Sequence, residues 1–69
     1  MDAKLIVARL KQANYKYSEG KTIKELLRQL PLSEQISIRN GLIGEKTKAD
    51  NSDIIDVIND IINVLGSNR

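Results

Sequence analysis

Apolar residues recur at helical spacing in four segments of the chain, and polar stretches separate these segments. The first predicted helix covers about residues 2–14, and Asp2 is well placed to cap it. The last predicted helix covers about residues 53–65, follows Ser52 as its cap, and has Gly66 as its natural stop. Isoleucine, valine and leucine occupy roughly half of its circumference, which is more than a surface helix needs. This helix is therefore expected to lie at the centre of the core or to share a face with another chain.

The second predicted helix covers about residues 22–30. Thr22 and Glu25 have the spacing of a capping box, in which each side chain satisfies an exposed backbone N–H group near the other. Pro31 ends this helix because it lacks an N–H donor and disfavours helical geometry in the residue before it. Ser18-Glu19-Gly20 is interpreted as a break between the first two helices.

The third segment, residues 33–41, has two interpretations. Ser33 can cap a short helix that Gly41 closes. Alternatively, Ile36 and Ile38 alternate with polar residues ahead of Asn40-Gly41, a dipeptide typical of tight hairpin turns. We favour the helix, because no other segment could extend a sheet. The chain is thus expected to form one all-α, four-helix domain over residues 1–69, with residues 44–51 as a polar loop.

Composition narrows the possible functions. The chain has no cysteine, histidine, tryptophan or phenylalanine, which excludes disulfides, Cys/His zinc sites and catalysis by histidine or a thiolate. We expect neither an enzyme nor a cofactor, and no small-molecule substrate. No apolar run approaches the length of a membrane span, and the first residues do not resemble a signal peptide. A cytoplasmic protein with no membrane partner is the expectation.

Charge is distributed unevenly along the chain. Residues 1–48 hold ten lysine and arginine residues against five acidic ones, whereas residues 49–69 hold one against four. This asymmetry predicts a basic surface for an anionic partner. Ordinary solvated surface is the alternative explanation.

Three motifs that could bind phosphate or metal fail on their details. Residues 41–47 contain glycines before a lysine and a threonine, but Glu45 interrupts the phosphate-binding pattern. Gly41 and Gly44 also have the spacing of a KH loop, without its flanking strands. Isoleucines at positions 54 and 55 break any calcium-loop pattern among the aspartates of residues 50–60, so no metal site is expected.

The middle of the chain resembles the helix-turn-helix of phage Cro and repressor-type regulators. The residues that carry the resemblance are Thr22 to Leu27, then Leu32 to Ser37, then Asn40-Gly41. In that family the second helix of the helix-turn-helix lies in the major groove and reads base edges. The resemblance therefore implies a small DNA-binding regulator of transcription, and it also implies a homodimer.

Carried over to this sequence, the resemblance implies two sets of DNA contacts. The residues that would read bases are Ser33, Glu34, Gln35, Ser37 and Arg39. The residues that would neutralise phosphates are Lys21, Lys24, Arg28, Lys46 and Lys48.

A protein partner is the alternative to DNA. Arg39 is the only cation in the predicted reading helix, and a weakly basic scaffold of this kind can bind a regulatory or host protein instead. An anti-repressor or inhibitor would then use the exposed members of an apolar anchor. The candidate residues of this anchor are Ile36, Ile38, Leu42 and Ile43.

Overall fold

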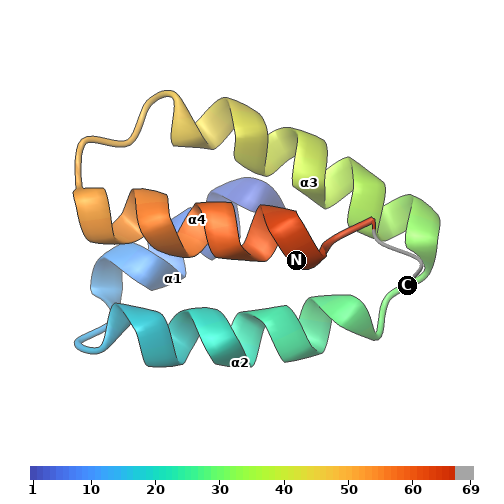
Figure 1. Ribbon diagram of the computed structural model, residues 1–69, viewed down its shortest axis with the longest axis horizontal. Helices are drawn as coiled ribbons and strands as arrows, with labels where there is room; N and C mark the ends of the chain where they lie inside the picture. Colours follow the sequence, from blue (N-terminus) through green and yellow to red (C-terminus); the bar gives the residue numbers. More distant parts are fainter. Residues whose placement is uncertain (67–69) are drawn as a thin grey trace.

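Four helices make up the regular structure of the protein, which a computed structural model describes over residues 1–66 (Figure 1). The helices are α1 (Ala3–Gln12), α2 (Lys16–Arg28), α3 (Leu32–Lys46) and α4 (Ser52–Val64). The all-α prediction is confirmed, and the hairpin alternative is wrong, because Asn40 and Gly41 lie inside α3. Within the described range, no helix is both long enough and apolar enough to cross a membrane.

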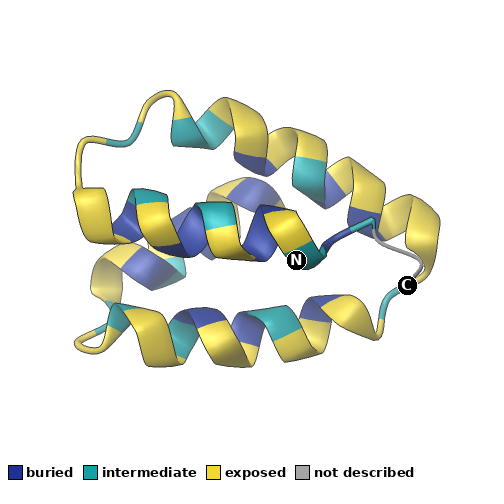
Figure 2. Ribbon diagram, viewed as in Figure 1, coloured by how far each residue is buried: buried dark blue, intermediate teal, exposed yellow. Residues whose placement is uncertain are grey.

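Helices α1 and α4 each contact all three of the other helices. Helices α2 and α3 pack on α1 and α4 from opposite sides and only weakly against each other, as Figure 1 shows with α4 between them. Buried side chains line the inward faces of all four helices (Figure 2). The wide apolar arc of α4 is therefore explained by its central position, and the central pair is α1 and α4. The buried apolar residues, none of them aromatic, are Ala3, Ile6, Val7, Leu10, Ile23, Leu27, Ile38, Leu42, Ile54, Val57, Ile58, Ile61, Ile62 and Leu65.

Helix α2 begins at Lys16, well before the predicted start at Thr22. The predicted break at Ser18-Glu19-Gly20 is wrong, because Gly20 is buried inside the helix against Val57 of α4. The predicted capping box is also wrong, since the Thr22 hydroxyl lies in mid-helix and donates to the carbonyl of Ser18 at 3.3 Å. The glycine in this segment permits close packing of two helices rather than a turn.

Helix α3 is longer than predicted at both ends. It starts at Leu32 directly after Pro31, so Ser33 is in the first turn and is not the N-cap. It continues past Gly41 to Lys46, which shortens the predicted polar loop. A Cβ atom on Gly41 would lie 2.8 Å from the Cβ of Ala3, so this glycine marks the close approach of α3 to α1.

The ends of α1 and α4 follow familiar capping chemistry. Asp2 Oδ1 accepts from the Leu5 N–H at 2.8 Å, as predicted for the cap of α1. Asn51, one residue before the predicted cap Ser52, accepts from the N–H groups of Asp53 and Ile54 and caps α4. Gly66 has a φ of 71° and terminates α4 as expected, because only glycine adopts this conformation without strain.

Gly20 and Gly44, two mid-helix glycines in different surroundings, provide a matched test of this packing. A Cβ at position 20 would lie well inside the contact distance of Val57 Cγ1, so Gly20→Ala should destabilise the protein by about 1–3 kcal/mol. A Cβ at position 44 meets nothing within 4 Å, so Gly44→Ala should stabilise it by about 0.5–1 kcal/mol. Urea unfolding followed by circular dichroism measures both changes. Equal stabilisation by the two substitutions would contradict the close contact of α2 with α4.

Candidate functional site

Three large aliphatic side chains are exposed along one flank of α3. Leu32, Ile36 and Ile43 are 46%, 43% and 39% exposed. At 3.6 residues per turn, positions four and eleven residues apart fall on the same side of a helix. These three residues, here termed the apolar stripe, therefore lie in one row along the helix. The other large exposed apolar residues of the described chain lie outside α3, on α1 and α2 or next to them.

A groove separates the apolar stripe from the end of α4. We call it the terminal groove; it has a volume of about 460 Å³ and is lined by Ile36, Arg39, Ile62, Asn63, Leu65 and Gly66. A Cβ on Gly66 would meet Ile36 Cγ1 at 3.4 Å and Arg39 Cδ at 3.7 Å. The missing side chain at Gly66 therefore keeps the groove open where it borders α3.

Arg39 carries the only charge among the residues that line the terminal groove. It occupies the position between Ile36 and Ile43 on the same flank of α3 and is half-buried. Among residues 1–66, the ion pairs join Arg9 to Glu19, Lys24 to Asp60 and Lys48 to Glu45, and none includes Arg39.

The structure separates the residues expected to read bases. Ser33, Glu34 and Ser37 are exposed on α3, but Gln35 is buried. The Gln35 side-chain amide donates to the carbonyls of Leu30 at 2.8 Å and Arg28 at 3.1 Å, and its oxygen accepts from the Gly66 N–H at 3.2 Å. Gln35 is thus engaged in joining three segments of the fold, because it satisfies backbone groups that two helix ends leave without helical partners.

Of the five residues expected to contact phosphates, three are already engaged in the fold. Lys24 pairs with Asp60, Lys46 donates to Asn59 Oδ1 at 2.9 Å, and Lys48 pairs with Glu45 at 3.6 Å. Lys21 and Arg28 are exposed on α2, across α4 from α3 (Figure 1). Only Lys46 and Lys48 lie on or next to α3, so the structure does not bring all five cations together on one face.

The expected apolar anchor divides into two pairs. Ile36 and Ile43 are exposed, in keeping with a contact role. Ile38 and Leu42 are buried in the core, so they are unavailable to a partner. The reason is helical geometry: α3 continues through all four positions and turns 38 and 42 inward, toward α1 and α4.

Leu32 is the member of the apolar stripe that sequence reasoning missed. The predicted third helix begins at residue 33 and leaves Leu32 outside it, whereas Leu32 is the first residue of α3. A proline directly before a helix is favourable because its missing N–H needs no partner there. With the helix started at position 32, the spacing of Leu32, Ile36 and Ile43 would have shown the row.

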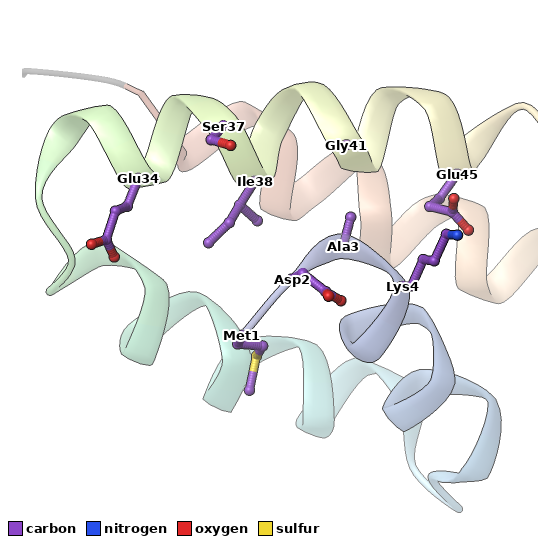
Figure 3. A pocket seen from close by; sticks show the side chains of 9 residues that line it. All are labelled: Met1, Asp2, Ala3, Lys4, Glu34, Ser37, Ile38, Gly41 and Glu45. Atoms are coloured by element: carbon purple, nitrogen blue, oxygen red, sulfur yellow. The ribbon is translucent and has the colours of Figure 1, made fainter.

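A second hollow lies between the start of α1 and α3 (Figure 3). It has a volume of about 570 Å³, and Asp2, Lys4, Glu34 and Glu45 are its charged residues. Asp2 caps α1 and Glu45 pairs with Lys48, while Figure 3 shows Lys4 directed toward Glu45. Contacts within the fold therefore engage Asp2 and Glu45, two of the four charged residues of this hollow.

The aspartates of α4 are also engaged by neighbouring helices. The Tyr17 hydroxyl donates to Asp56 at 3.3 Å and to Asp53 at 3.4 Å. Desolvation, and then the negative charges of these two carboxylates, raise the pKa of Tyr17 above its ordinary value of 10.0. Among residues 1–66, no three acidic side chains are grouped closely enough to hold a metal ion.

Comparison of the chain with protein-family models, with curated proteins and with solved structures gives no match.

Substitution of Gln35 tests its assignment to the fold. Gln35→Ala removes the partners of two carbonyls and one N–H group, so it should destabilise the protein by about 2 kcal/mol. Glu34→Ala changes the exposed neighbouring position and should alter stability by less than about 0.5 kcal/mol. Thermal and urea unfolding measure the difference between the two variants. Unchanged stability in Gln35→Ala would show that this side chain is free to serve another purpose.

Proposed function

We propose that this protein is a helical protein-binding module that contacts its partner through the apolar stripe of α3. The observation that carries the proposal is the row formed by Leu32, Ile36 and Ile43, which the fold leaves exposed. An anti-repressor or an inhibitor acts through contacts of this kind, since each works by occupying the surface of another protein.

Exposed aliphatic residues on this row have no evident structural purpose. The core is completed by Ile38 and Leu42 on the inward side of the same helix. Isolated apolar residues are common on protein surfaces, but an aligned row beside a groove is typical of interaction sites. Partner binding would bury the row, and the surrounding polar residues would form the rim of the contact.

The contacts of the polar residues favour a protein partner over DNA. Of the base-reading set, Gln35 is committed to backbone hydrogen bonds. Of the phosphate set, Lys24, Lys46 and Lys48 are engaged with side chains of the protein itself. DNA affinity depends largely on the number of cations available to phosphates on one face. The apolar stripe, by contrast, needs no rearrangement to meet an apolar partner.

Charge substitutions within the apolar stripe test this proposal. Ile36→Glu and Ile43→Glu should each weaken partner binding at least about thirtyfold, because each replaces an apolar contact near the centre of the interface with a strongly hydrated carboxylate. Leu5→Glu is the matched control, since Leu5 is an equally exposed leucine on α1. Proteins retained from a lysate of the source cells are compared quantitatively for the four immobilised forms. We expect the parent protein and Leu5→Glu to retain a protein that neither Ile36→Glu nor Ile43→Glu retains.

Two further measurements decide whether a loss of partner binding results from the change in the apolar stripe. Circular dichroism should show unchanged folding in Ile36→Glu and Ile43→Glu, whereas Ile38→Glu should unfold the domain because Ile38 is buried. A random duplex DNA pool at low ionic strength is the second probe. Binding to it that falls steeply with added salt and survives Ile36→Glu would favour a DNA-binding regulator and overturn the proposal.

A further inference from the structure

We infer that the partner presents an amphipathic helix with a carboxylate, and that this carboxylate pairs with Arg39 at the terminal groove. This inference rests on the proposed function, because it specifies the chemistry of the partner at the same face of α3. Its basis is the position of one cation in line with three exposed aliphatic residues.

The shape of the surface fits a helix. The apolar stripe runs along α3 from its first residue to Ile43, and the end of α4 forms the opposite wall of the terminal groove. An amphipathic helix laid along such a surface presents its own apolar residues at spacings of three, four and seven. The spacing of Leu32, Ile36 and Ile43 matches this repeat, so one face of a partner helix can contact all three side chains.

The charge of the surface specifies what must accompany those apolar residues. Arg39 lies between Ile36 and Ile43, and neither an ion pair nor a hydrogen bond to its side chain occurs within residues 1–66. The other polar residue that lines the groove is Asn63, which is uncharged. A partner that covered Arg39 with apolar atoms alone would leave its charge without compensation. A carboxylate supplies that compensation and accepts hydrogen bonds from the planar guanidinium.

A second copy of this chain does not satisfy these requirements. In a symmetric dimer the same patch meets itself, so pairing Ile36 with the partner copy's Ile43 would bring the two Arg39 side chains together at the centre. The exposed aspartates of α4 offer no alternative, because none of the large exposed apolar residues lies on that helix. A symmetric contact between two copies through this face is thus unfavourable, and we assign the complementary surface to a different protein.

Selection from a peptide library tests the inference without knowledge of the natural partner. A phage-displayed library of 16-residue helices, with random residues on one face, is selected in parallel against the parent protein and Arg39→Glu. Lys21→Glu is the matched control, since it makes the same change of charge at an exposed position on α2. The parent and Lys21→Glu should enrich helices that carry aspartate or glutamate beside aliphatic residues. Arg39→Glu should enrich lysine or arginine at the same positions.

The affinities of the selected peptides test the role of Arg39 separately from the proposed function. The inference expects the acidic peptides to bind Arg39→Glu at least about tenfold more weakly than the parent and to lose binding in Ile36→Glu. A gain of binding to basic peptides by Arg39→Glu cannot result from unfolding. Selected peptides that require Ile36 but show no acidic preference would overturn the role of Arg39 and leave the proposed function in place. Failure to obtain any peptide that requires Ile36 or Ile43 would overturn both.

Discussion

The close approach of α2 and α4 at Gly20 is the constraint on which the rest of the fold depends. The core contains only aliphatic side chains, which fill less space than aromatic rings and therefore require short distances between helices. Gly20 lets the backbone of α2 reach Val57, and Gly41 does the same for α3 at Ala3. With these two contacts in place, Ile23, Leu27, Ile58 and Ile61 lose nearly all solvent contact. A wider spacing between the helices would expose these side chains to solvent. No disulfide could offset the lost stability, because the chain has no cysteine.

Gln35 connects this packing to the candidate site. Its hydrogen bonds join the end of α2, the first turns of α3 and the residue that follows α4. Ile36 follows Gln35 in the chain. Gly66 donates its N–H to the Gln35 side-chain oxygen and also forms one edge of the terminal groove. A buried amide with all of its partners in place thus holds both walls of the groove in register.

Periodicity predicted the helical class, and it placed α1 and α4 to within one or two residues at each end. The prediction failed at glycines, because a glycine can indicate either the end of a helix or a close contact between two helices. Gly20 and Gly41 looked like helix ends in the sequence, yet they lie inside helices because another helix passes close by, and only Gly66 acts as a stop. The candidate site was predicted in part: Ile36, Ile43 and Arg39 were named, whereas Leu32 was missed with the start of α3. Gln35 was misassigned because local sequence does not show that two helix ends converge on its side chain.

The inward and outward positions of α3 differ in how strongly the fold constrains them. This difference affects how the sequence of the protein can change during evolution. The inward positions of the helix, together with Gln35, are constrained by the core and by buried hydrogen bonds. The outward positions Leu32, Ile36, Arg39 and Ile43 have few such obligations, so substitutions there leave the scaffold intact. For the binding function that we propose, recognition can therefore diverge rapidly while the architecture stays constant. A lineage of such chains could acquire new binding specificities through a handful of surface changes on a single helix.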